Sequence, residues 1–178
     1  MKKTLKHPKA DPEKRSVYCQ KIKKHQDTSR PIVYIDESGF SHDMPRTHGY
    51  STKGQRCYGT HDWGAKGRTN AIGALIGATL LTVSLFESTI NSDVFTAWVQ
   101  QDLIPKLPEQ SVVVMDNATF HKQSEMQDSL AAAGHTLLYL PPYSPDLNPI
   151  EKKWAQTKSI RRKLRCSIDR LFQRPLMC

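Results

Sequence analysis

Three acidic residues, Asp36, Asp116 and Glu151, are spaced so that their carboxylates could share one catalytic site. Asp36 ends the β-branched run of residues 31–35, and Asp116 ends the apolar run of residues 111–115. Each run predicts a buried β-strand. If the two strands are parallel neighbours, both acids emerge at one sheet edge, where α/β proteins commonly place ligands. Glu151 begins a predicted helix whose first turn would pack back towards that edge.

Carboxylates gathered in this way could serve phosphodiester chemistry. Their oxygens are the hard ligands that Mg²⁺ prefers. Two such ions, about 3.5–4 Å apart, can stabilise both the attacking and the leaving oxygen of a phosphoryl transfer. In that arrangement Asp36 would bridge both ions, while Asp116 and Glu151 would each hold one. The residues therefore predict a site for two Mg²⁺ (or Mn²⁺) ions.

Each acid also has a purely structural interpretation. Asp36 and Asp116 could be ordinary turn residues after strands, because Asp-Glu-Ser-Gly and Asp-Asn are turn sequences. Glu151 stands three residues after Asn148, with Pro149 between them, which is the pattern of a capping box. A capping carboxylate can still bind a metal, because the helix dipole favours negative charge there. Position alone therefore leaves both interpretations open.

The predicted helix from Pro149 to about Arg165 is basic, and its charges gather on one face. At 100° per residue, Glu151, Lys158, Arg162 and Arg165 project together, with Trp154 and Arg161 at the edge. This face could lead DNA phosphates towards a metal site, or it could be a solvated surface. The cations that we expect to contact DNA are Lys152, Lys158, Arg161, Arg162 and Arg165.

The other side of this helix is predicted to pack against the rest of the protein. The arc next to the cations carries the residues expected to face the core, which are Ile150, Thr157, Ile160 and Leu164. We expect Trp154 to pack in the core or against a helix rather than to stack on a DNA base.

The charge of the chain is unevenly distributed around a net value of +9. Residues 1–30 carry a net charge of +7 and residues 151–178 carry another +7, whereas residues 31–150 carry −5. Basic flanks around an acidic centre suit a protein that grips a polyanion and keeps carboxylates for another task. A lysine-rich N-terminus alone would also be typical of a solvated tail.

Hydrophobic patterning predicts one domain around the acids. The predicted strands cover residues 31–35, 70–77, 79–86, 111–115 and 136–140. The predicted helices run from Asn91 or Ser92 to about Pro105, from Lys122 to Ala133 and from Pro149 to about Arg165, with a short one around residues 15–24. This order is that of the ribonuclease H-like fold, an α/β sandwich with a mixed five-stranded sheet flanked by helices.

Other patterns argue against several classes of protein. The apolar run of residues 71–86 is too short and too rich in Gly, Ser and Thr to span a membrane. No opening segment has the features of a signal peptide, so a cytoplasmic protein is expected. The four cysteines are scattered without a C-x-x-C pair, which disfavours a zinc site. The sequence has no Gly-rich phosphate loop, which disfavours a small-molecule enzyme.

Three segments resemble the motif blocks of mariner-like bacterial insertion-sequence transposases, a group of the DDE superfamily. They are residues 34–40 (YIDESGF), 114–122 (VMDNATFHK) and 140–154 (LPPYSPDLNPIEKKW). In that group 34 residues separate the second acid from the third, and 34 residues separate Asp116 from Glu151 here. The resemblance covers about residues 30–172.

This resemblance implies that Asp36, Asp116 and Glu151 are metal-binding catalytic residues of cut-and-paste transposition. Water would nick the ends of a DNA element, and the freed 3′-hydroxyls would attack target DNA, typically at a TA dinucleotide. The implied partner is double-stranded DNA, bound by a homodimer at the nucleoid of a bacterium. Asn117, His121 and Asn148 also match motif positions and could lie around the acids, where His121 would touch a phosphate or, as we expect, brace the site.

The organisation that follows is a basic N-terminal arm (1–29), a ribonuclease H-like catalytic domain (30–173) and a short tail (174–178). Such transposases usually carry helix-turn-helix modules before the catalytic core, and 29 residues are too few for them. An upstream-encoded helix-turn-helix polypeptide could supply this module. The alternatives are a ribonuclease H-like nuclease without strand transfer, and a truncated, inactive DNA-binding remnant.

Overall fold

Five strands form one mixed sheet in the order β3-β2-β1-β4-β5. The computed structural model describes residues 7–43, 51–56, 58, 67–118 and 123–173. β1 and β3 pair antiparallel with β2, whereas β4 runs parallel to both β1 and β5. The strands are β1 (Ile32–Ser41), β2 (Arg68–Ile76), β3 (Thr79–Phe86), β4 (Val112–Met115) and β5 (Thr136–Tyr139).

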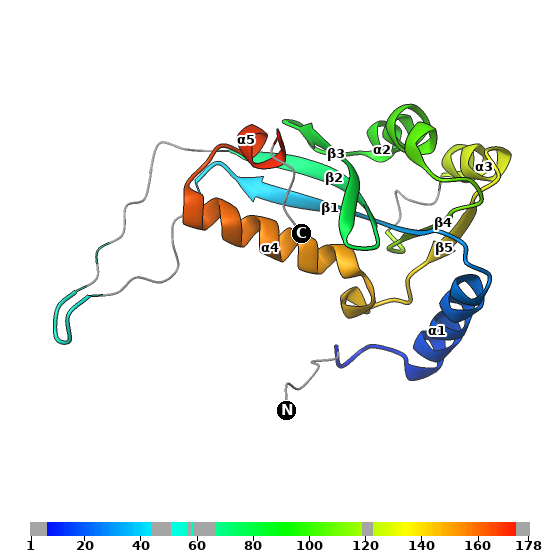
Figure 1. The fold of residues 1–178 in the computed structure, drawn as a ribbon, viewed down its shortest axis with the longest axis horizontal. Coiled ribbons are helices and arrows are strands. Elements are labelled where there is room, and N and C mark those ends of the chain that lie inside the picture. Colours follow the sequence, from blue (N-terminus) through cyan, green and yellow to red (C-terminus); the bar gives the residue numbers. More distant parts are fainter. Residues whose placement is uncertain (1–6, 44–50, 57, 59–66, 119–122, 174–178) are drawn as a thin grey trace.

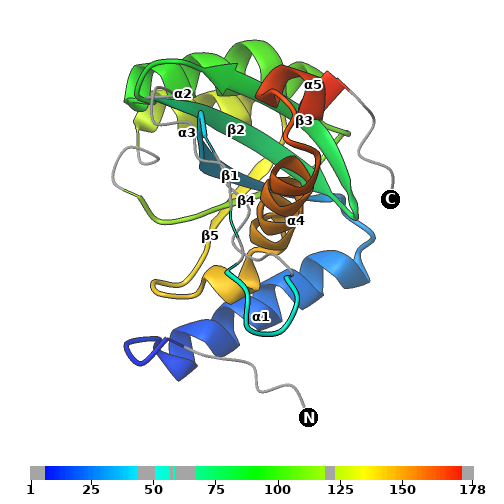
Figure 2. The same ribbon diagram turned by 90° about the vertical axis from the view of Figure 1, so that its left-hand side faces the viewer.

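Helices cover both faces of this sheet. Figures 1 and 2 show α2 and α3 on one face and α4 and α1 on the other. The α-helices are α1 (Pro12–Asp27), α2 (Ser92–Trp98), α3 (Ser124–Ala132), α4 (Pro149–Leu164) and α5 (Ile168–Gln173). The other helical turns are η1 (Val99–Leu103), η2 (Ile104–Lys106) and η4 (Pro145–Leu147). Among the residues described, no helix is long and apolar enough to cross a membrane.

The predicted order of elements is confirmed, and the clearest difference is the length of β1. β1 continues to Ser41, so Asp36 lies in mid-strand instead of at the strand end. The reason is pairing on one side only: β1 pairs with β4 only as far as Tyr34, but with β2 as far as Ser41. The interpretation of the Asp-Glu-Ser-Gly segment as a turn is therefore wrong.

Alternation along β1 divides the core between the two faces of the sheet. Val33 and Ile35 are fully buried in the cluster beneath α2 and α3, because successive side chains of a strand point to opposite faces. Phe40 is fully buried on the other face, in the cluster beneath α4 and α5. The sheet thus has a packed layer on each side.

α4 lies very close to the sheet because β2 has a glycine beneath it. The Trp154 ring covers Gly73, and an ideal Cβ at Gly73 would lie 2.6 Å from Trp154 Cη2. Trp154 is 2% exposed, which confirms its predicted place in the core. Gly73 is the cross-strand partner of Asp36, so α4 is docked directly over the strand pair that carries this acid.

The buried face of α4 differs from the predicted arc. Ile150 and Thr157 are buried as expected, but the rest of the face is Trp154 and Arg161, and Leu164 is 59% exposed. A cation can occupy this position because backbone carbonyls satisfy its guanidinium. The Arg161 nitrogens donate to the carbonyls of Ser41 (2.6 Å), His42 (3.0 Å) and Cys166 (3.3 Å).

α1 packs against the parallel half of the sheet and is longer than the short helix predicted. Asp11 caps its N-terminus by accepting from Glu13 N at 2.9 Å. Tyr18 and Ile22 are buried in a cluster that also contains Leu140. α1 therefore covers the strand ends that lead into the loop before α4.

A two-point ion pair joins α1 to the turn that precedes α4. Arg15 Nη1 donates to Asp146 Oδ1 at 2.8 Å, and Arg15 Nη2 donates to Asp146 Oδ2 at 2.7 Å. The two side chains are 12% and 24% exposed. This fork geometry is stronger than a single surface contact, because two parallel hydrogen bonds reinforce the charge attraction.

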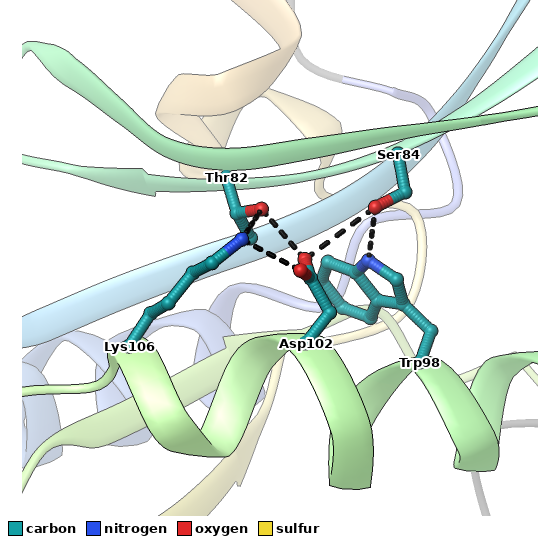
Figure 3. Close-up of polar contacts among 5 residues, drawn as sticks. All are labelled: Thr82, Ser84, Trp98, Asp102 and Lys106. Atoms are coloured by element: carbon teal, nitrogen blue, oxygen red, sulfur yellow. Dashed lines mark hydrogen bonds and ion pairs between the residues drawn. The ribbon is translucent and has the colours of Figure 1, made fainter.

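A polar network connects β3 to the helical stretch of α2, η1 and η2, which lies on the face of the sheet opposite to α4 (Figure 3). Asp102 accepts from Thr82 Oγ1 at 2.6 Å and from Lys106 Nζ at 2.6 Å. Trp98 Nε1 donates to Ser84 Oγ at 3.0 Å beside them. Burial acts to raise the pKa of Asp102, but hydrogen bonds from Lys106 and Thr82 outweigh it and hold this pKa below its ordinary value of 3.8.

We expect Asp102→Asn to lower the free energy of unfolding by about 1–2 kcal/mol at neutral pH, because it removes hydrogen bonds to a charged group. The folded-state pKa of Asp102 is lower than its unfolded value. Its contribution is therefore complete above about pH 3.8 and is lost as the pH falls through the folded pKa. Urea denaturation at pH 6 and pH 3 measures this, and an equal difference between the two proteins at both pH values would contradict it.

We expect Arg15→Ala and Asp146→Ala each to lower the free energy of unfolding by about 1–2 kcal/mol. The double variant should lose less than the sum, because both single changes break the same pair. Lys14→Ala is the control, since Lys14 is 65% exposed and its nitrogen lies 3.9 Å from Asp11. Denaturation midpoints test this, and additive losses would show that the pair contributes nothing.

Candidate active site

Asp36, Asp116 and Glu151 line one open pocket of about 390 Å³. They come from the middle of β1, the end of β4 and the first turn of α4. Because β1 and β4 are parallel neighbours, their chains leave this part of the sheet in the same direction. The structure thus brings the three predicted acids to one place, although they are far apart in the sequence.

The Asp36 carboxylate is buried in an environment that disfavours its charge. Its Oδ2 atom is buried and accepts no hydrogen bond from the described residues. Burial, followed by the negative charges of Glu151 and Glu37, raises the pKa of Asp36 from 3.8 to about 8. A buried carboxylate surrounded by charges of its own sign is typical of functional sites, because a positive partner is needed to stabilise it.

Asp116 follows β4 directly, as predicted, and its side chain shapes the next turn. Asp116 Oδ1 accepts from Ala118 N at 3.0 Å. The structural and the functional interpretations of Asp116 are therefore compatible, because this exposed residue both closes a turn and lines the pocket.

Asn148 joins α4 to β1 beside Asp36. It is the N-cap residue of α4, but its side chain makes no capping hydrogen bond, so the predicted side-chain capping box is wrong. Asn148 Nδ2 instead donates to the carbonyl of Ile35 at 3.5 Å, the limit of a hydrogen bond. Asn148 Oδ1 is buried and has no hydrogen-bond partner within the described ranges. Asn148 thus places the start of α4, and with it Glu151, against the strand of Asp36.

The donors around this pocket fit a hard divalent cation. They are carboxylate and amide oxygens, and two of them, Asp36 Oδ2 and Asn148 Oδ1, are buried without hydrogen-bond donors in the described part of the protein. As the side chains stand, no three His, Cys, Asp or Glu residues among those described are close enough to hold one ion together. A shared ion would therefore require the three acids to converge further.

The first part of the loop between β5 and α4 also lines the pocket, and its residues before Asn148 were not predicted as site residues. Pro141, Pro142 and Ser144 line the pocket, and Ser144 is only 3% exposed. Tyr143 stands at the rim, 53% exposed, with a left-handed backbone (φ 55°). The proline-rich sequence of this loop was the available signal, because prolines restrict the backbone and favour a rigid wall.

The predicted DNA-contacting cations of α4 do not all reach the surface. The prediction that Arg161 contacts DNA is wrong. Arg161 is 7% exposed, and its guanidinium donates hydrogen bonds to backbone carbonyls. Lys152 and Arg165 are exposed, while Lys158 and Arg162 are half-buried. Of the other motif residues expected around the acids, Asn117 is exposed and lines the pocket, and His121 lies outside the described residues.

We expect Asp36→Asn to raise the free energy of unfolding in EDTA at pH 7 by about 2 kcal/mol, because folding raises the pKa of this carboxyl to about 8 and so forces it to take up a proton at pH 7, a cost that asparagine avoids. Asparagine has nearly the same size, so packing should be conserved. Asp128→Asn, at an exposed position of α3, is the control and should have little effect. Chemical denaturation measures the change, and a loss of stability in Asp36→Asn would mean that the carboxylate has a stabilising partner.

Several solved structures share this fold. A Mos1 transposase paired-end complex with the left transposon end matches 90% of this chain and 54% of that chain, with 20% identity and a TM-score of 0.65. A Mos1 strand transfer complex matches 84% of this chain and 49% of that one, with 22% identity and a TM-score of 0.61. The isolated catalytic domain of Mos1 transposase matches 88% of this chain and 76% of its own, with 14% identity and a TM-score of 0.56.

The chain therefore spans about half the length of the Mos1 chains in those complexes. The expected ribonuclease H-like fold, with its mixed five-stranded sheet and flanking helices, is confirmed by this likeness. A search of curated protein sequences found no match. The sequence family described as DDE superfamily endonuclease matches residues 31–171, most of the chain. The protein belongs to the DDE superfamily endonucleases.

Proposed function

We propose that this chain is the catalytic domain of a DNA transposase that cuts and joins DNA strands with divalent metal ions. The observation that carries the proposal is the meeting of Asp36, Asp116 and Glu151 in one pocket at the parallel strands. Similarity to Mos1 structures that are described as paired-end and strand transfer complexes supports DNA as the substrate.

In this proposal the three acids hold two Mg²⁺ or Mn²⁺ ions. Similar Mos1 paired-end complexes are described with Mg and with Mn, which supports these metals. The ions would neutralise charge at the phosphate and activate the oxygen nucleophile. Asp36 would be a ligand from mid-strand, because its Oδ2 atom is buried without a hydrogen-bond donor among the described residues and the charges of Glu151 and Asp116 both act on its carboxylate.

The residues of this chain would serve two successive reactions at the same pocket. In the first, water attacks a phosphodiester at the element end, the P–O3′ bond breaks, and a 3′-hydroxyl is released. In the second, that 3′-hydroxyl attacks a phosphodiester of target DNA, which joins the element to the target and releases a target 3′-hydroxyl. Asn148 would hold Glu151 beside β1 throughout both reactions.

The full proposal includes partners. Two copies would act as a homodimer on paired DNA ends, and a helix-turn-helix polypeptide would recognise the end sequences. The basic face of α4 would hold the backbone of double-stranded DNA through Lys152, Lys158, Arg162 and Arg165.

We expect Asp116→Asn to reduce metal-dependent DNA cleavage and joining by about 100-fold or more, because a metal ligand is lost. DNA binding in EDTA should not weaken, since the change removes a negative charge. Mn²⁺ should raise the melting temperature of the unaltered chain more than that of the variant. The assay combines DNA that carries the element ends, a target plasmid, and Mg²⁺ or Mn²⁺.

Asp128→Asn on the exposed side of α3 should cut and join as the unaltered chain does. Cleavage without any joined product would favour a ribonuclease H-like nuclease over a transposase. DNA binding without metal-dependent cleavage by the unaltered chain would favour an inactive DNA-binding remnant.

A further inference from the structure

Arg68, the first residue of β2, lies across β1 in a space that only a glycine leaves open. Gly39 is the diagonal cross-strand neighbour of Arg68, since Ser41 pairs with Arg68 and Gly39 with Asn70. An ideal Cβ at Gly39 would stand 1.6 Å from Arg68 Nε and 1.9 Å from both Cζ and Nη2. Any other residue at position 39 would therefore displace the guanidinium of Arg68.

Two cations of α4, Lys158 and Arg162, lie on the other face of the sheet beside this part of β1. Lys158 Nζ stands 5.5 Å from the ring centre of Phe40, whose side chain points to the face of β1 opposite to that of Gly39. Lys158 and Arg68 therefore approach this part of β1 from its two faces. Arg162 follows one helical turn later on the same face. Burial, then the positive charge of Arg68, lowers the pKa of Lys158, while the charge of Glu151 acts in the opposite direction. Lys158 thus lies within electrostatic range of both Arg68 and the carboxylate pocket.

These three cations have no carboxylate partner among the described residues. Two cations elsewhere in the protein do have such partners: Arg15 pairs with Asp146 and Lys106 with Asp102. Like charges repel when they are held together, so such a group is stabilised by an anion from outside. In the part of the sheet that the structure describes, β4 pairs with β1 only as far as Tyr34, so no strand pairs with that edge of β1 at Gly39.

We propose that Arg68, Lys158 and Arg162 form a binding site for backbone phosphates of DNA beside the carboxylate pocket. Arg68 was not among the cations predicted from the sequence, and it differs from them because it reaches the site from the sheet. Gly39 is a positioning residue, because its missing side chain provides the space for the guanidinium. The inference rests on the proposed function, since it takes DNA as the ligand.

The test measures equilibrium binding of a fluorescein-labelled 30-base-pair duplex to the full chain in EDTA, between 50 and 200 mM KCl. We expect Arg68→Ala to weaken binding about 5- to 10-fold and to reduce the slope of log K against log salt by about 1. Arg68 is exposed and makes no ion pair with the described residues, so its removal should leave the fold intact. Lys23→Ala, which removes one exposed charge from α1, is the control for net charge and should have a smaller effect.

Gly39→Ala provides a sharper variant, because it keeps every charge and moves only the guanidinium. Its added Cβ meets the flexible end of the Arg68 side chain and its backbone φ is not positive, so the fold should tolerate it. We expect it to lose most of the affinity that Arg68→Ala loses. In the Arg68→Ala background, where the space is empty, Gly39→Ala should cause no further loss.

Three results would overturn the inference: an effect of Arg68→Ala no larger than that of Lys23→Ala, normal binding by Gly39→Ala, or additive losses in the double variant. Because binding is measured without metal, the inference and the proposed function can fail separately. A chain that shows these binding effects but never cuts DNA supports the phosphate site and contradicts the transposase proposal. If the unaltered chain cuts and joins DNA with metal but Arg68→Ala binds DNA normally, the transposase proposal is supported and the phosphate site is contradicted.

Discussion

The close contact between α4 and the sheet is the constraint on which the rest of the site depends. Trp154 can approach β2 this closely only because Gly73 has no side chain to meet the indole. Glu151 lies one turn before Trp154, and Gly73 is paired with Asp36. The same packing contact therefore places the third acid over the strand of the first. Asn148 reinforces it through the carbonyl of Ile35.

Charge is arranged around this contact so that neither sign is neutralised within the site. Asp36 is half-buried beside other acids, and burial of its carboxylate, followed by the negative charges of Glu151 and Glu37, raises its pKa. Lys158 lies in the field of both Glu151 and Arg68. Functional sites are often less stable than the surrounding fold, because groups kept ready for a ligand repel one another until the ligand binds. Ligands of both signs would relieve this repulsion, as the proposed metal-dependent enzyme acting on a polyanion would require.

The surrounding structure stabilises this strained centre through fully paired polar contacts. The fork of Arg15 on Asp146 holds the turn before α4 against α1. On the opposite face, Asp102 is satisfied by Thr82 and Lys106. Both arrangements combine charge with hydrogen bonds in partly buried positions, where such bonds contribute more than they do in open water. The cations of these two pairs are occupied, which distinguishes them from those beside the pocket.

Local patterns in the sequence determined the order of the elements, since β-branched runs and helical spacing act over a few residues. They also located the acids and the start of α4, because Asn148 and Pro149 mark a helix start wherever they occur. Tertiary structure alone decided that Asp36 lies in mid-strand, that Arg161 is buried, and that Arg68 crosses β1 at Gly39. Each of these three features depends on a partner far away in the chain, such as the neighbouring strand β2 or the carbonyls at the end of β1. Spacing along one segment does not reveal such a partner, because the partner is brought near only by folding.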